Sequence, residues 1–144
     1  MFPYRRLVVW QKAHRLAIAV RSSFARCTAP DIASQVRRAS ASIPTNIVEG
    51  AGSQTNGMFV RFLGIALASA QETEYLLLLA RDTGHLTAPD HECLSAQCTE
   101  IQRMLSGLLG AVRRGSAAGT AASTGARRHV EPVHRRRPAN EKEE

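Results

Sequence analysis

An apolar stripe with a period near 3.6 residues recurs in four segments of this chain, and it constrains the fold more than any other feature. In each segment hydrophobic side chains stand three or four positions apart with polar ones between them, which is typical of an amphipathic helix. The segments cover about residues 6–27, 32–47, 56–83 and 94–112. The sequence has no run that alternates apolar and polar residues in the manner of a strand. It therefore predicts an all-α protein.

The residues that line up in the four stripes form the candidate core. They are Val9, Ala13, Leu16, Val20, Phe24 and Cys27, then Ile32, Val36, Ala39, Ile43 and Ile47, then Phe62, Ile65, Ala66, Ser69, Thr73, Leu76 and Ala80, and finally Leu94, Cys98, Ile101, Leu105, Leu108 and Val112. The three connections are short and contain helix-breaking residues, as in TAPD and EGAGSQTNG. Short connections favour antiparallel neighbours. We expect an up-down-up-down antiparallel four-helix bundle.

The composition changes after Arg114 and divides the chain into two parts. Residues 1–114 carry the four stripes and are expected to form the bundle domain. Residues 115–144 contain a stretch rich in Ala, Gly and Ser and then an Arg-rich stretch with almost no large apolar residues. Such a segment cannot bury enough surface to offset the entropy lost on ordering. We expect a disordered tail, whose arginines either contact nucleic acid or are simply solvated.

The charge of the chain is strongly positive. The formal net charge is +7 and the isoelectric point is about 10.3. A basic surplus attracts polyanions such as RNA, DNA or an anionic membrane. The alternative is a charged surface that only keeps the protein monodisperse.

The cysteines and the apolar runs indicate in which cellular compartment the protein is expected. Three cysteines are an odd and sparse set, which argues against a disulfide framework and for buried free thiols in a reducing compartment. The run LVVW is too short for a signal peptide. No uninterrupted apolar run approaches the ~20 residues of a membrane span. We expect a cytoplasmic protein without a membrane segment.

Pro44 stands inside a stretch that otherwise predicts a helix. The apolar stripe stays in phase from Ile32 to Ile47, which favours a single helix bent at Pro44. Ser40, Ser42 and Thr45 could then bond to backbone groups that the bend leaves free. In the alternative, Ser42 caps a new short helix with Pro44 near its start.

A polar stripe runs beside the apolar one in the second segment. It consists of Gln35, Arg38, Ser42, Asn46 and Glu49. The third segment has a similar polar insertion at Ser69 and Glu72. A half-buried carboxylate needs a cation or several donors. We hypothesise that Glu72 or Glu49 pairs with Arg37 or Arg38, either between the second and third helices or across a subunit interface; the alternative is two solvated faces that never meet.

The sequence contains no constellation that predicts catalysis, a metal or a cofactor. A di-iron bundle uses Glu-x-x-His motifs, but Glu72 is followed three residues later by Tyr75. None of His14, His85 and His91 has a ligand partner at the third or fourth position after it. SQTNG lacks the lysine of a phosphate-binding loop. We expect a protein that is not an enzyme and needs no cofactor.

Three stretches resemble the bacterial four-helix bundle proteins encoded within 23S rRNA intervening sequences. They are VVWQKAHRLAIAV, QVRRASASIPTNIVEG and FLGIALASAQETEYLLLLARDTGHL. The residues matching the family pattern are Trp10, Lys12, Ala13, Gln35, Arg37, Arg38, Ala39, Ser42, Ile43, Pro44, Asn46, Ile47, Glu49, Gly50, Phe62, Leu63, Ile65, Ala66, Ser69, Glu72 and Glu74. The resemblance covers about residues 4–112. It departs at Ser53, where the family usually has Arg.

The resemblance implies a left-handed four-helix bundle that assembles as a homopentamer. The family is similar to the accessory variability proteins of diversity-generating retroelements, which are basic pentamers that bind nucleic acid and a reverse transcriptase. We expect a non-enzymatic homo-oligomer that binds RNA or DNA through basic positions. The candidates are Arg5, Arg6, Lys12, Arg15, Arg37 and Arg38. The alternative is a protein-interaction scaffold, or a mobile-element accessory factor, that docks a partner protein.

Overall fold

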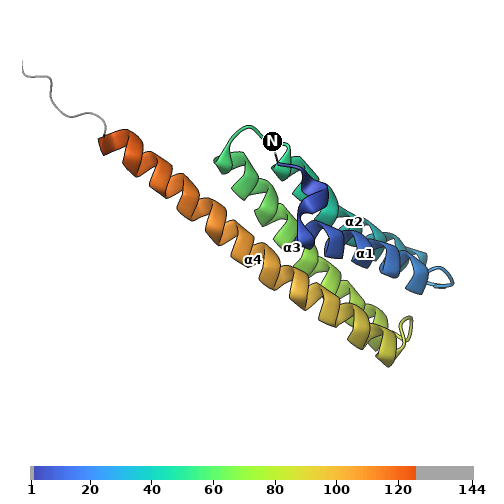
Figure 1. The fold of residues 1–144 in the computed structure, drawn as a ribbon. Helices are drawn as coiled ribbons and strands as arrows, with labels where there is room; N and C mark the ends of the chain where they lie inside the picture. The colour runs from blue at the N-terminus through green and yellow to red at the C-terminus, as the bar shows by residue number, and fades with distance from the viewer. Residues whose placement is uncertain (1, 126–144) are drawn as a thin grey trace, which may run out of the picture.

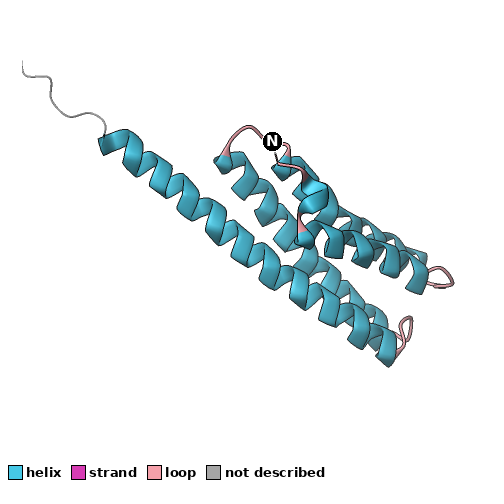
Figure 2. Cartoon of the chain, in the orientation of Figure 1, coloured by secondary structure: helices cyan, strands magenta, loops and turns pink. Residues whose placement is uncertain are grey.

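The computed structural model describes residues 2–125 of the 144-residue chain, and within this range it is entirely helical apart from connections. A 3-10 turn, η1, precedes four α-helices (Figures 1 and 2). The elements are η1 at Tyr4–Arg6, α1 at Val8–Ser23, α2 at Pro30–Ala51, α3 at Asn56–Asp82 and α4 at Ala88–Gly125. Each helix packs against the next one along the chain, and α4 packs back against α1. The predicted all-α, up-down-up-down four-helix bundle is confirmed.

Helix α1 is shorter than the sequence predicts. It ends at Ser23, whereas the apolar stripe continues to Cys27. Phe24 follows in a turn, yet its side chain is fully buried. Pro30 opens α2, and proline disfavours helical backbone in the residue before it. The apolar stripe therefore continues beyond the end of α1, because Phe24 packs into the core from the turn.

The core follows the predicted stripes on α1 and α2. Large side chains from all four helices and from the turn after α1 are fully buried at its centre, namely Leu16, Val20, Phe24, Val36, Ile43, Ile47, Leu63, Leu77, Ile101 and Leu105. On α4, Leu109 is buried while the predicted Leu108 and Val112 are half-buried.

The stripe predicted for α3 is partly wrong. Ile65, placed in the core by sequence, is 40% exposed, whereas Leu63, Ala70 and Leu77 are buried. Helix α3 is apolar on almost every side, so its sequence carries only a weak periodic signal. The buried face could not be assigned from spacing alone.

Helix α2 runs without interruption through Pro44, so a single helix is correct and the alternative of a new helix is wrong. Pro44 has no N–H to donate to the Ser40 carbonyl four residues earlier. Side chains nearby donate to backbone carbonyls of the same helix. Thr45 Oγ1 donates to the Ala41 carbonyl at 2.8 Å. Asn46 Nδ2 donates to the carbonyl of Ser42 at 2.8 Å.

Helix α4 continues past the predicted end of the domain and projects beyond the other helices (Figure 1). The end of α4 at Gly125 therefore differs from the domain boundary predicted at Arg114. Residues 115–125 contain four alanines and no proline but also three glycines, and they extend a helix that is already nucleated. Residues 126–144 lie outside the described range, so the disorder expected of them stays a prediction.

Candidate nucleic-acid interface

Positive charge is concentrated in the first third of the chain. Residues 1–48 contain eight Lys and Arg residues and one acidic residue, Asp31. Residues 49–115 contain five basic and seven acidic residues. The basic surplus of the bundle thus lies on η1, α1 and most of α2, while α3 and α4 are slightly acidic. Any surface that attracts a polyanion is expected on the α1–α2 side.

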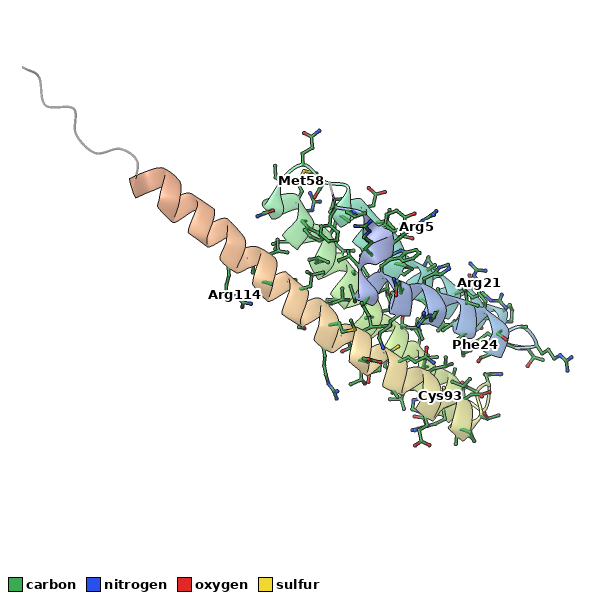
Figure 3. The ribbon with its side chains drawn as sticks, in the orientation of Figure 1. Arg5, Arg21, Phe24, Met58, Cys93 and Arg114 are labelled. Atoms are coloured by element: carbon green, nitrogen blue, oxygen red, sulfur yellow. The ribbon has the colours of Figure 1, made fainter. Side chains whose placement is uncertain are left out.

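The outer side of α2 carries a hollow of about 610 Å³ that we call the basic groove. Its lining consists of Arg21 from α1 and of Ser34, Arg37, Arg38, Ala41, Ser42 and Thr45 from α2. Arg21 and Arg38 are exposed, and Figure 3 shows Arg21 near the end of α1 that leads to Phe24. Because Ala41 has only a methyl group, it leaves room between the longer side chains. The groove is therefore lined by three arginines and by small or polar side chains.

One of the three arginines is held in place by the backbone. Arg37 is half-buried, and its Nη2 donates to the carbonyl of Phe24 at 2.9 Å. That carbonyl belongs to the residue after α1 and also accepts from the Cys27 N–H at 3.1 Å. At this end of the helix the dipole favours a cation. This contact has a structural role, and it also fixes one positive charge at the edge of the groove.

The charge of the groove is not compensated by carboxylates. Across the described side chains, ion pairs form only between Lys12 and Glu100 and between Arg81 and Asp82. No carboxylate of the described residues thus lies within ion-pair distance of Arg21, Arg37 or Arg38. Asp31 and Glu49 are exposed on α2 about one turn beyond the ends of the groove. Arg21 and Arg38 are therefore exposed to an anion without a competing carboxylate, and Arg37 adds a positive charge that is held by the Phe24 carbonyl.

The other sequence-predicted cations lie apart from the groove. Arg5 and Arg6 are exposed on η1, and the guanidinium carbon of Arg5 is 5.9 Å from the centre of the Tyr4 ring. Lys12 is a weak candidate because its Nζ lies 2.7 Å from Glu100 Oε1, which compensates its charge. Arg15 is exposed and lines a hollow between α1 and α4 together with these two residues.

Sequence reasoning missed Arg21, which completes the groove. Within its own helix Arg21 is an ordinary exposed residue. The one available signal is the predicted hairpin, in which the last turn of one antiparallel helix lies near the first turns of the next. It does not fix which side chains of the two helices meet.

The family-pattern residues on α2 and α3 form a polar contact between these helices. The hydroxyl oxygens of Ser42 and Ser69 are 2.9 Å apart. Asn46 Nδ2 donates to Ser42 Oγ at 3.0 Å. Gly50 is buried, and a Cβ there would lie only 2.8 Å from Cδ2 of Phe59. These residues, with buried Pro44, serve the packing of α2 on α3.

The hypothesised pairing of Glu72 or Glu49 with Arg37 or Arg38 within the chain is wrong. Both glutamates are exposed, as is Gln35, and neither glutamate forms an ion pair with any described residue. Arg37 bonds to the Phe24 carbonyl instead. A pairing across a subunit interface stays a prediction.

The remaining titratable groups give no sign of a reactive centre. Within the described part of the chain, no three His, Cys, Asp or Glu residues gather closely enough to hold a metal ion. Burial, reinforced by the Glu74 carboxylate, raises the pKa of the Cys98 thiol to about 12. Cys27 is half-buried, and Cys93 is exposed, contrary to the expectation that all three thiols are buried (Figure 3).

Helix α3 satisfies the length and composition of a membrane-crossing helix. The sequence prediction considered only uninterrupted apolar runs, and α3 contains polar residues among its apolar ones. In the structure α3 packs between α2 and α4, and core helices of bundles commonly have this composition.

Comparison with known proteins agrees with the bundle architecture. No curated protein matches the chain. A solved structure of a protein with unknown function from the S23 ribosomal protein family of Bacteroides thetaiotaomicron is similar, with 29% identity and a TM-score of 0.68. The match covers 72% of this chain and 96% of that one. The family model described as 23S rRNA-intervening sequence protein matches residues 5–107. The chain therefore belongs to the 23S rRNA-intervening sequence protein family.

Proposed function

We propose that this protein is a non-enzymatic, homo-oligomeric bundle that binds RNA or DNA through the α1–α2 side. The observation that carries the proposal is the basic groove, which is lined by Arg21, Arg37 and Arg38 without a carboxylate in ion-pair distance. Guanidinium groups match phosphate oxygens in geometry and charge. The phosphate backbone is the ligand that such a groove fits best.

Binding of this kind does not depend on base sequence, and it weakens as salt rises. The concentration of basic residues before residue 49 supports this side of the molecule over the slightly acidic α3–α4 side. A monomer offers few phosphate contacts. An oligomer would repeat the groove, and simultaneous contacts raise the affinity through avidity.

The direct test replaces Arg21 and Arg38 by Gln in the full chain. Both side chains are exposed, so the fold should tolerate the change. Arg103 and Arg113, both exposed on α4, provide the matched control, because their replacement by Gln removes the same charge elsewhere. Binding to a labelled RNA or DNA of about 16 nucleotides is followed by anisotropy.

The groove variant should bind about ten-fold more weakly or worse, since a hydrogen bond to a charged group contributes about 1.5–3 kcal/mol. The control variant should stay close to the wild type. An equal loss of affinity in both variants would mean that binding depends only on net charge. An unchanged affinity of the groove variant would exclude the groove as the binding site.

The outer side of α3 supports the oligomeric part of the proposal. Its exposed large apolar residues are Met58, Ile65, Tyr75 and Leu78. A helix that is apolar on almost every side is normally buried on every side. We assign this surface to contact with a second copy of the chain, in line with the homopentamer that the resemblance implies.

Light scattering after size exclusion tests the assembly. The variant Tyr75→Glu, at a residue that is 60% exposed, should dissociate the oligomer, while Val8→Glu, which is similarly exposed on α1, should not. A wild-type chain that is monomeric at all concentrations would favour the alternative, in which this surface docks a different protein.

A further inference from the structure

Three aromatic rings gather where α1 begins, and we call them the ring cluster. The Tyr4 and Trp10 ring centres are 4.9 Å apart at an interplanar angle of 69°. The His14 ring stacks on Trp10, with centres 5.0 Å apart and an angle of 7°. Trp10 is half-buried against the core, whereas His14 is exposed. The outer face of the imidazole is therefore open to solvent while its inner face is covered by the indole.

The ring cluster is held rigidly by contacts that do not involve His14. The N–H of Leu7 donates to the Tyr4 carbonyl at 2.9 Å, which closes η1. Gln11 Nε2 donates to the Arg5 carbonyl at 2.9 Å and ties η1 to the first turn of α1. These contacts fix the backbone from which Tyr4 projects, and the Trp10 ring, packed against the core, supports the stacked His14 ring. A supported ring loses less conformational freedom on binding.

The ring cluster and the basic groove lie on the same side of the molecule. His14 and Arg21 are seven residues apart on α1, so they lie on nearly the same edge of the helix and about 10 Å apart along it. On α2, Thr45 lines the groove, and Val48, one turn later, lines a hollow with Tyr4. Arg5 is exposed next to the rings, with its guanidinium carbon 5.9 Å from the centre of the Tyr4 ring.

We propose that the ring cluster is a stacking platform for a base of a single-stranded nucleic acid whose phosphates lie in the basic groove. This inference rests on the proposed function and names the class of its ligand. A flat ring with one open face, with an arginine nearby, is the arrangement on which unpaired bases stack. Bases within a duplex are already stacked on their neighbours and cannot use it.

The inference makes a prediction that charge alone does not make. A duplex has the higher charge density, so a purely electrostatic surface prefers it. A stacking platform reverses the preference, because only a single strand gains the contact with His14. Stacking on His14 also requires a base, and an abasic oligomer with the same phosphates has none.

The experiment uses the full chain and three oligomers of about ten nucleotides: oligo(dT), the abasic strand of equal length, and a duplex. Oligo(U) tests RNA in parallel. His14→Leu fills the same space without a flat ring, His14→Phe keeps one, and Ser22→Ala is the control on the exposed side of α1. Trp10 is the only tryptophan, so its fluorescence reports events at the ring cluster.

We expect the wild type and His14→Phe to bind oligo(dT) or oligo(U) about ten-fold more tightly than the abasic strand, with quenching of Trp10. His14→Leu should lose this preference and retain its affinity for the abasic strand. Equal binding of base-bearing and abasic strands by the wild type would overturn the inference and leave the proposed function intact. Failure to bind any oligomer at low salt would overturn both.

Discussion

The hydroxyl oxygens of Ser42 and Ser69 lie 2.9 Å apart and join α2 to α3 two residues before Pro44. Asn46 Nδ2 also donates to Ser42 Oγ, so one small polar group serves two partners. Ser69 is buried and Ser42 is half-buried. The Ser42–Ser69 contact thus gives the buried hydroxyl groups hydrogen-bond partners, close to Pro44, which lacks a backbone N–H donor.

Replacing either serine by Ala should reduce the free energy of unfolding by about 1 kcal/mol, because each change leaves its partner with one bond fewer. The double variant should lose less than the sum of the two single losses, since both remove the same bond. Urea unfolding of the four chains measures this coupling. Additive losses would show that the two hydroxyls act independently.

Gly50 allows α2 and α3 to approach closely. A Cβ at this position would lie 2.8 Å from Phe59 Cδ2 and 3.1 Å from Phe62 Cβ. Gly50→Ala should therefore lower the free energy of unfolding by about 1–3 kcal/mol, as overpacking does. Gly107→Ala is the matched control, because it is also within a helix but has nothing within 4 Å of an added Cβ. The control should be neutral or stabilising by up to about 1 kcal/mol. A stable Gly50→Ala would contradict the close packing.

The stability of the bundle should decrease in alkali through Cys98. Burial, with Glu74 nearby, raises the pKa of its thiol from 9.0 to about 12. Below pH 9 the thiol is protonated in both states and its contribution is complete. Between pH 9 and 12 the unfolded chain loses this proton while the folded chain keeps it, so stability falls as pH rises.

Urea unfolding at about pH 8 and about pH 10.5 checks this dependence. The fall should be smaller in Cys98→Ala than in the wild type, and it should persist in Cys93→Ala, whose thiol is exposed. An identical pH dependence in Cys98→Ala and the wild type would contradict the assignment.

The buried faces of α1 and α2 could be read from the sequence, because each combines an apolar stripe with a polar outer face. The face of α3 could not, since apolar residues such as Ile65 and Tyr75 also occupy its outer side. The length of α4 was missed for a different reason. A segment with too few large apolar residues to form a core can still prolong a helix that the bundle has nucleated.

The candidate site was predictable only in part. Sequence identified Arg37 and Arg38 as cations but could not show that Arg21 lies beside them, because that contact joins two helices. It also could not show that Lys12 is compensated by Glu100, which is 88 residues away in the chain. The spacing of residues predicts on which side of its helix a residue lies. Its ionic partner, in contrast, depends on which helices become neighbours.

The central claim is that the basic groove binds the phosphate backbone, and the salt dependence of binding tests it most directly. The logarithm of the association constant of the full chain for a single-stranded oligonucleotide is measured against the logarithm of salt concentration. The slope is negative, and each lost phosphate contact reduces its magnitude by about 0.7. We predict that the slope of Arg21→Gln/Arg38→Gln is smaller in magnitude than that of the wild type by about 1.4 for each groove that the strand occupies, while Arg103→Gln/Arg113→Gln keeps the wild-type slope. Equal slopes for all three chains would contradict the claim.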